Sequence, residues 1–133
     1  MLDLEKLIES AGDAIVAADT DGKILLWNAS AERIFGHSKS EALGQTLDLI
    51  IPERLRERHW TGYRQVMQTG KTRYGTDLLR VPAIHKDGRR LSIAFTVTLL
   101  PGAIVAFMRD ETARWNEERA LRDRIKALEA KGP

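Results

Sequence analysis

The residue best placed for coordination chemistry in this sequence is a histidine inside a helical pattern. His59 lies four residues after Leu55, three before Gly62 and seven before Val66, so the four share one stripe of a helix, which faces the core if the helix packs on other elements. Tyr63 lies on the same side. A glycine inside a helix costs about 1 kcal/mol relative to alanine, so Gly62 indicates that a flat or bulky group approaches the backbone. An inward imidazole beside cleared space is suited to axial ligation of haem iron through a neutral ring nitrogen.

Two other interpretations of this region stay open. His59 can be a core histidine bonded to a backbone carbonyl, because an unsatisfied buried polar group costs about 1 to 3 kcal/mol. Trp27 and Trp60 can stack on a flavin or simply pack in the core. The absence of cysteine rules out disulfides, thiolate metal sites and a covalent flavin adduct, while a noncovalent flavin remains possible. The chain has no phosphate-binding glycine loop and no arrangement of nucleophile and base, so we do not expect an enzyme.

Composition indicates one globular domain. The chain has 133 residues, of which 43% are hydrophobic and 30% are charged, with a formal charge of +2. The two signs of charge are well mixed, so nucleic acid is not an expected partner. No apolar run approaches the roughly 18 residues of a membrane span. The first ten residues, MLDLEKLIES, are acidic and amphipathic without a signal-peptide core, so we expect a cytoplasmic location and no membrane contact.

Patterns along the chain predict the elements that position His59. Asp21 and Gly22 lie between two compact apolar runs, Ala14–Ala18 and Ile24–Trp27, which is typical of a strand hairpin. The helix that carries His59 is predicted from about Glu53 to Gln68.

The second half is strand-rich. Residues 91–99 alternate apolar and polar side chains with a period of two, and Ala103–Met108 is a further apolar strand. Tyr74–Ile84 reads as an extended segment in which Pro82 predicts an edge strand or a bulge. A short N-terminal helix and a charged C-terminal helix flank these elements. The order predicts an α+β domain, an antiparallel sheet with helices over one face.

Three stretches carry a family resemblance: DAIVAADTDGKILLWNASAERIFGHSKSEALGQ, then HKDGRRL, then MRDET. Together they resemble the PAS sensor domains. The resemblance implies a five-stranded antiparallel sheet in the order 2-1-5-4-3, with helices closing a pocket over its inner face. PAS domains detect small molecules, light, redox state or gases, or mediate association. We expect an N-terminal flanking helix in residues 1–11, the PAS sensor domain in 12–112 and a signalling or dimerisation helix in 113–133.

The His59 helix carries a second resemblance. Pro52, Glu53, Arg56, Arg58 and His59 stand in the same register as in the proximal-histidine helix of haem PAS domains of rhizobial oxygen-sensor kinases. The resemblance implies haem b with His59 as the metal ligand, and Gly62 and Tyr63 beside it. A sensor of diatomic gases or redox state is therefore the expected function.

The opposite wall of the expected pocket departs from those oxygen sensors. Counting back from Asp87, Leu79 stands where the resemblance implies an oxygen-contacting arginine, and Arg80 is its neighbour. One residue along a strand reverses the face, so that donor is missing unless a bulge shifts the register. Leu79, Phe95 and Val97 then make the wall apolar, which favours carbon monoxide or nitric oxide over stable oxygen binding.

The C-terminal helix suggests a partner. Leu121, Ile125 and Leu128 are spaced four and three apart, as a coiled-coil seam requires. We expect a homodimer through the terminal helices or contact with an effector domain; alternatively the helix covers its own sheet. The competing functions are a cofactor sensor, a PAS module without ligand that mediates dimerisation or protein interaction, and a receptor for a small organic ligand.

Overall fold

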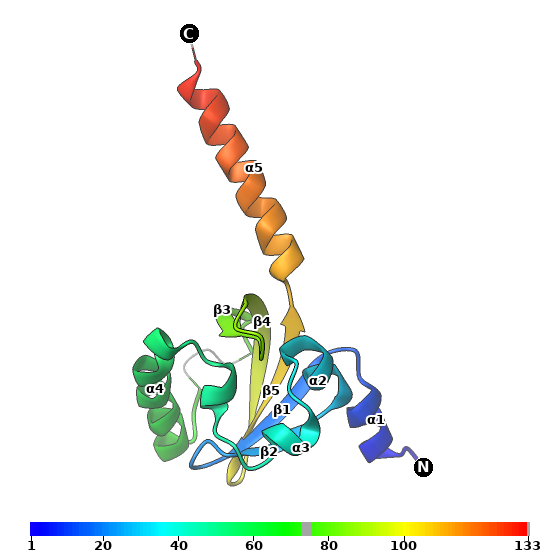
Figure 1. Cartoon of the computed structure of the whole chain (residues 1–133). Helices are drawn as coiled ribbons and strands as arrows, with labels where there is room; N and C mark the ends of the chain where they lie inside the picture. The colour runs from blue at the N-terminus through cyan, green and yellow to red at the C-terminus, as the bar shows by residue number, and fades with distance from the viewer. Residues whose placement is uncertain (73–75, 133) are drawn as a thin grey trace.

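The fold is described from a computed structural model, which describes residues 1–72 and 76–132. Five strands and seven helical segments follow one another as α1 (Leu4–Ser10), β1 (Ala14–Asp19), β2 (Ile24–Trp27), α2 (Ala29–Phe35), α3 (Lys39–Ala42), the 3-10 turns η1 (Leu47–Ile50) and η2 (Glu53–Leu55), α4 (Arg56–Thr69), β3 (Leu79–Ile84), β4 (Arg90–Leu100), β5 (Ala103–Asp110) and α5 (Thr112–Ala130). Figure 1 shows their arrangement.

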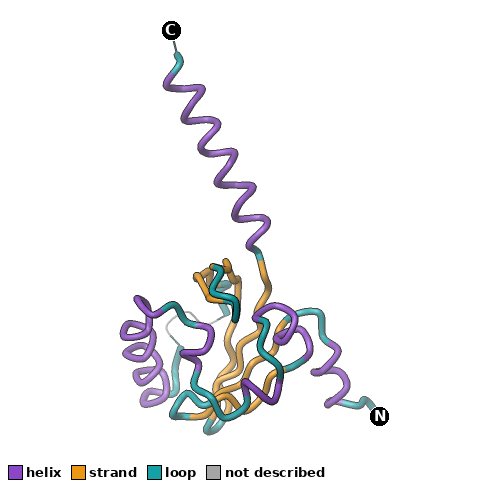
Figure 2. The backbone as a smooth tube through the Cα atoms, viewed as in Figure 1, coloured by secondary structure: helices purple, strands orange, loops and turns teal. Residues whose placement is uncertain are grey.

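The strands form one antiparallel sheet in the order β2-β1-β5-β4-β3 (Figure 2). The predicted α+β class and strand order are therefore confirmed. The Asp21-Gly22 turn joins β1 to β2, and Gly22 has a φ of +80°, a left-handed conformation that glycine adopts without strain.

The core lies on one face of this sheet. Alternate residues of the central strands are buried there, among them Val16, Ile93 and Met108, because successive side chains of a strand point to opposite faces. Phe35 of α2 and Tyr63 of α4 belong to the same cluster. The helices α2 and α4 therefore cover the inner face.

Asn28 joins three elements at one end of the core. Its Oδ1 accepts hydrogen bonds from the backbone N–H groups of Ile15 and Ala31, both at 3.0 Å. Its Nδ2 donates to the carbonyls of Ile8 at 2.8 Å and Asp13 at 3.1 Å. The side chain is 1% exposed and satisfies all four backbone groups, so it fixes the end of α1 against β1 and α2.

Two expectations need refinement at the second half of the sheet. The predicted Glu53–Gln68 helix begins with the 3-10 turn η2 before α4 starts at Arg56. Pro82 lies in the edge strand β3, whose register with β4 is unbroken from Leu79 to Ile84, so the bulge alternative is wrong. The predicted start of this extended segment, Tyr74, lies outside the described residues.

The C-terminal helix α5 projects away from the sheet (Figure 1). Its three seam residues are exposed, Leu121 by 60%, Ile125 by 54% and Leu128 by 62%. The interpretation in which this helix covers its own sheet is wrong, because only the first turns of α5 approach β4. Within residues 1–72 and 76–132, no helix is long and apolar enough to cross a membrane.

Candidate functional site

Helix α4 is held to the domain by aromatic side chains. Trp60 packs against Gly22 in the β1–β2 turn, where a side chain on that glycine would overlap the indole ring. The Trp60 Nε1–H donates to Asp48 Oδ1 at 2.7 Å, and the Tyr63 hydroxyl donates to the carbonyl oxygen of Asp19. Burial raises the pKa of Tyr63 to about 12, with Asp19 adding to the shift, so the hydroxyl keeps its proton.

His59 packs beside these aromatic rings and is half-buried. Its ring is 4.7 Å from that of Trp60 and 5.7 Å from that of Tyr63, measured between centroids. Its Nδ1 atom is buried and has no hydrogen-bond partner among the described residues. Burial lowers the pKa of His59, although the nearby Asp48 opposes the shift, so the ring is neutral at pH 7. A neutral imidazole with an unused nitrogen is what metal ligation requires.

Gly62 does not face the packed rings. It is exposed, and a Cβ built on it would meet no atom within 4 Å. The predicted inward position of Gly62 is therefore wrong, whereas its role beside a cofactor stays a prediction. The helix packs through the stripe of Trp60, Tyr63 and Met67, which has the same three-and-four spacing as the stripe of His59, Gly62 and Val66.

Strands β3 and β4 carry the apolar side chains that the sequence predicts for the far wall of the pocket. Leu79 is paired with Phe95 in the β3–β4 register, and Val97 follows on the same face. That face is the inner one, since Ile93 and Phe95 both join the core cluster. Arg80 is paired with Ala94 on the other face and forms an ion pair with Glu111 at 3.2 Å. The predicted reversal of face between these two neighbours is therefore confirmed.

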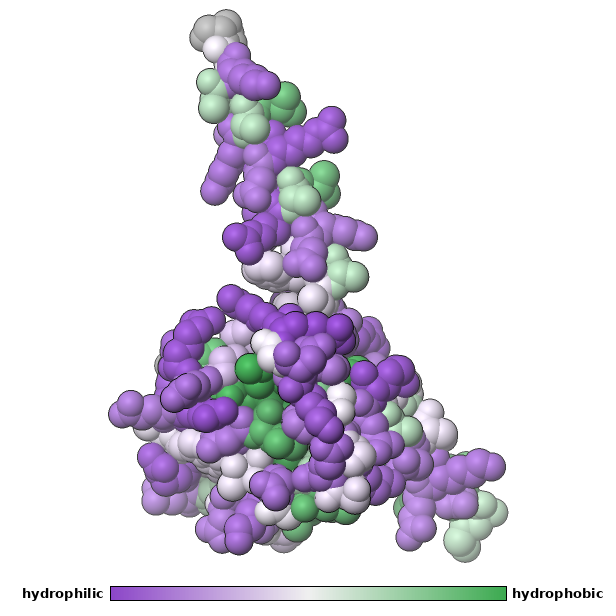
Figure 3. All heavy atoms as spheres, viewed as in Figure 1, coloured by the Kyte–Doolittle hydropathy of each residue, from purple (hydrophilic) through white to green (hydrophobic). Residues whose placement is uncertain are grey.

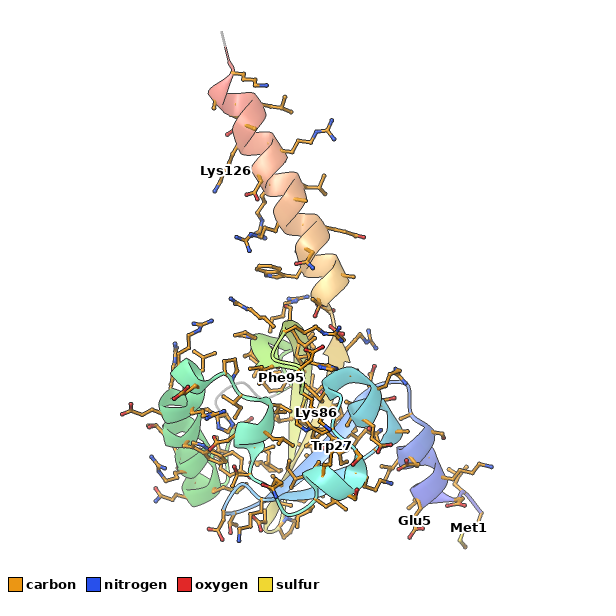
Figure 4. The ribbon with its side chains drawn as sticks, viewed as in Figure 1. Met1, Glu5, Trp27, Lys86, Phe95 and Lys126 are labelled. Atoms are coloured by element: carbon orange, nitrogen blue, oxygen red, sulfur yellow. The ribbon has the colours of Figure 1, made fainter. Side chains whose placement is uncertain are left out.

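The inner face is less well covered near this wall than at its other end. Leu91 and Ile93 are fully buried, whereas Leu79, Phe95 and Val97 are only half-buried. Figure 3 shows hydrophobic side chains gathered in a recess in the middle of this view, surrounded by hydrophilic ones. Figure 4 places Phe95 in the same part of the view. The sheet thus presents an apolar surface that its own helices do not close.

Several residues that hold the site gave weak signals in the sequence. Gly22 was interpretable only as a turn residue, and nothing in the sequence ties Asp48 to Trp60. Trp27, a possible flavin-stacking residue, is fully buried and donates its Nε1–H to the His37 carbonyl at 3.0 Å, so it packs in the core.

In the described part of the chain, no group of three or more histidine or carboxylate side chains is placed to hold a metal ion. One imidazole fits a metal that brings its other ligands with it, as haem does.

A comparison with protein-family models matches residues 2–110 to the family described as the PAS fold. The chain belongs to the PAS family. This PAS domain is therefore a sensory domain of signal transduction. The family resemblance found in the sequence is confirmed.

Two curated relatives are sensors. The chain is 39% identical over 56 residues to the sensor protein FixL of Bradyrhizobium diazoefficiens, which covers 42% of this chain and 11% of FixL. It is 23% identical over 118 residues to the oxygen sensor protein DosP of Escherichia coli (strain K12), and the matched region covers 86% of this chain and 15% of DosP. The PAS domain thus spans a small part of the length of each relative.

Solved structures share the fold. The PAS domain of a protein from Colwellia psychrerythraea has a TM-score of 0.68 at 23% identity, over 83% of this chain and 95% of that chain. The PAS domain of the Cronobacter turicensis quorum-sensing receptor RpfR was solved in complex with BDSF. It has a TM-score of 0.65 at 16% identity, over 77% of this chain and 97% of that chain. At these identities the likeness concerns the fold alone.

Proposed function

We propose that this PAS domain binds haem b and that His59 is the axial ligand. The observation that carries the proposal is the buried Nδ1 of His59, which has no partner among the described residues. A buried polar atom without a partner costs about 1 to 3 kcal/mol, and ligation of a metal would remove that cost. The resemblance of the helix to proximal-histidine helices of haem PAS domains supports the same assignment. So does the likeness to DosP, an oxygen sensor protein.

The residues around His59 suit a flat hydrophobic cofactor. Trp60 and Tyr63 contact the ring and fix the helix that carries it, while Phe95 and Val97 offer half-buried apolar area on the inner face of the sheet. Bound haem would supply an iron that takes a diatomic gas. The corresponding position on β3 is Leu79, which has no donor to offer. We therefore expect carbon monoxide or nitric oxide to be bound in preference to stable oxygen. The role we propose is ligand binding without catalysis.

Absorption spectroscopy tests the haem proposal. Protein expressed with ample haem precursor should show a Soret band, and His59→Ala should abolish it or shift it strongly. His37→Ala is the matched control, because this histidine lies elsewhere in the fold, against Trp27. A Soret band that is the same in wild type and His59→Ala would contradict the assignment. A protein that stays colourless with haem precursor would contradict it too.

A small organic ligand is the second candidate function. The half-buried apolar wall of the recess favours it, and the RpfR PAS domain, which shares the fold, was solved with BDSF and with C12:0. Mass spectrometry of the native protein would reveal a retained molecule. Retention that survives His59→Ala but fails after Phe95→Asp would favour this function over haem. A flavin would show its own visible absorption in the same samples.

We further propose that a second copy of this chain pairs along α5. The exposed seam of Leu121, Ile125 and Leu128 has no partner within the described part of its own chain. In the heptad that this seam defines, Leu121 and Leu128 occupy d and Ile125 occupies a. Pairing along α5 is also expected of a PAS module without ligand. A dimer alone therefore does not distinguish that function from a haem sensor, and the absorption spectrum is needed as well.

Charges beside the seam favour a parallel pair in register. Glu117 and Arg124 occupy g positions, and Arg122 and Glu129 occupy the e positions five residues later. A parallel in-register pair therefore places Glu117 opposite the Arg122 of the second copy and Arg124 opposite its Glu129. All four side chains are exposed and available.

Sedimentation of the full chain tests this pairing. Arg122→Glu should weaken the dimer, and the double variant Glu117→Arg with Arg122→Glu should restore it, because the pair is rebuilt with reversed signs. Lys126→Glu changes a charge at a b position, away from the seam, and serves as the control. A monomer at all concentrations would contradict the pairing. Contact with an effector domain and a cytoplasmic location stay predictions.

A further inference from the structure

A second concave site lies at the root of α5, apart from His59. It is a groove of about 530 Å³ between the first turns of α5 and the strands β3 and β4. Figure 1 shows the helix leaving the domain above these strands. Small-molecule sites have volumes of about 300 to 1,000 Å³, so the groove has the size of a ligand site.

Positive charge exceeds negative charge in this groove. Its charged lining consists of four arginines and two glutamates, namely Arg80, Arg90, Arg114, Arg122, Glu111 and Glu118. Arg80 pairs with Glu111 and Arg114 pairs with Glu118, each at 3.2 Å. Arg90 and Arg122 have no carboxylate partner among the described residues. Within the described part of one chain, the groove therefore holds two guanidinium groups whose charge no carboxylate neutralises. In the parallel pair proposed above, Arg122 would instead face the Glu117 of the second copy, so an anion in the groove and the pairing compete for this side chain.

One of these two arginines is held in place by an aromatic ring. The Arg90 guanidinium carbon lies 5.9 Å from the centroid of the Trp115 ring, within the range of a cation–π contact. Such a contact orients the guanidinium while leaving its N–H donors free. Trp115 and Pro82 add an apolar wall to the same groove. The lining is thus cationic and partly apolar.

We propose that the groove binds an organic phosphate of nucleotide size. Guanidinium forks match phosphate oxygens in geometry and charge, and two unpaired arginines suit a ligand with two or more negative charges. The wall formed by Trp115 and Pro82 takes the apolar part of such a ligand.

Binding at this place would affect the position of α5. Arg90 belongs to β4, and Arg122 belongs to the third turn of α5. The joint between the two elements is held by two hydrogen bonds, from Ser92 N–H to Thr112 Oγ1 at 2.9 Å and from Glu111 N–H to the Ser92 carbonyl at 2.8 Å. An anion bridging the two arginines favours the arrangement in which sheet and helix are close, and shifts the population toward it.

Calorimetry on the full chain tests the site, with ATP and inorganic pyrophosphate as the probes. ATP should bind, and the double variant Arg90→Gln with Arg122→Gln should weaken ATP binding by about tenfold or more, because two charge-assisted contacts are lost. Arg54→Gln is the control, since Arg54 is an exposed arginine of η2 outside the groove. Pyrophosphate should bind more weakly than ATP because it does not reach the apolar wall. His59→Ala should leave the ATP affinity unchanged, so this test is independent of the haem proposal.

Three results would overturn the proposal. One is the absence of ATP binding at low salt. Another is an equal loss of affinity in Arg54→Gln and in the double variant, which indicates diffuse attraction to a basic surface. The third is ATP binding no tighter than pyrophosphate binding. The tryptophan fluorescence gives a second measurement, because a change on adding ATP should be lost in Trp115→Phe, although Trp27 and Trp60 remain.

Discussion

Replacing Gly22 with alanine should destabilise the domain through Trp60. Gly22 has a φ of +80°, and a Cβ at this position would overlap the Cη2 and Cζ3 atoms of the indole ring. The ring must therefore move. Its displacement breaks the hydrogen bond to Asp48 and disturbs the ring contacts with His59 and Tyr63.

The size of the effect follows from two parts. A non-glycine residue in the left-handed region costs roughly 1 to 2 kcal/mol. The lost hydrogen bond contributes about 1 kcal/mol, and a disturbed aromatic pair about 0.5 to 1.5 kcal/mol. Gly44 offers a matched control, because its φ is +84° and a Cβ there would meet no atom within 4 Å. Gly44→Ala should therefore cost only the roughly 1 to 2 kcal/mol of the left-handed backbone. Gly22→Ala should lower the free energy of unfolding by about 2 kcal/mol more, because of the displaced Trp60 ring.

Urea denaturation followed by circular dichroism measures both free energies of unfolding. A double-mutant cycle adds Trp60→Ala, in whose background Gly22→Ala should cost no more than Gly44→Ala. Equal stability of the two glycine variants would rule out the overlap with Trp60 as the cause. An unchanged cost of Gly22→Ala in the Trp60→Ala background would rule it out too.

Two further predictions concern α4. Tyr63→Phe should lower the free energy of unfolding by about 1 kcal/mol, because the hydrogen bond to the Asp19 carbonyl is lost, although this carbonyl keeps the Gly22 N–H as a donor; an unchanged urea midpoint would contradict this. Since the pKa of His59 in the folded state lies below its ordinary value of 6.5, the unfolded chain takes up a proton more readily. Stability should therefore fall as the pH drops below about 6.5, and His59→Gln should weaken that dependence. His37, whose pKa burial also lowers, contributes in the same pH range, and Glu41 and Asp87, whose pKa values hydrogen bonds lower, contribute at more acidic pH. Equal pH profiles in wild type and His59→Gln would contradict the role of His59.

Local sequence patterns predicted an element correctly where a pattern fits only one kind of structure. The Asp21-Gly22 turn between two apolar runs predicted the β1–β2 hairpin, and the period of two in β4 predicted its buried face. The face reversal between Leu79 and Arg80 also followed from the strand period alone. The strand order came from the family resemblance, because long-range pairing leaves no periodic signal in the sequence.

The errors arose where two patterns fit equally well. Helix α4 carries two stripes with the same spacing, and the sequence does not say which of them meets the sheet. The stripe with Trp60 and Tyr63 faces the core because these large rings bury more apolar area than Gly62 offers. The His59 Nδ1, which has no hydrogen-bond partner in residues 1–72 and 76–132, and the groove beside Arg90 depend on neighbours distant in the sequence. Neither could be predicted from local spacing.

The straight course of α5 has a mechanical consequence. Its 19 residues extend over about 28 Å, and the whole helix is anchored at one end by the bonds between β4 and Thr112. A tilt of about 10° at that anchor moves the far end sideways by roughly 5 Å. A rearrangement too small to alter the sheet is therefore amplified into a lateral displacement of several ångströms at Ala130.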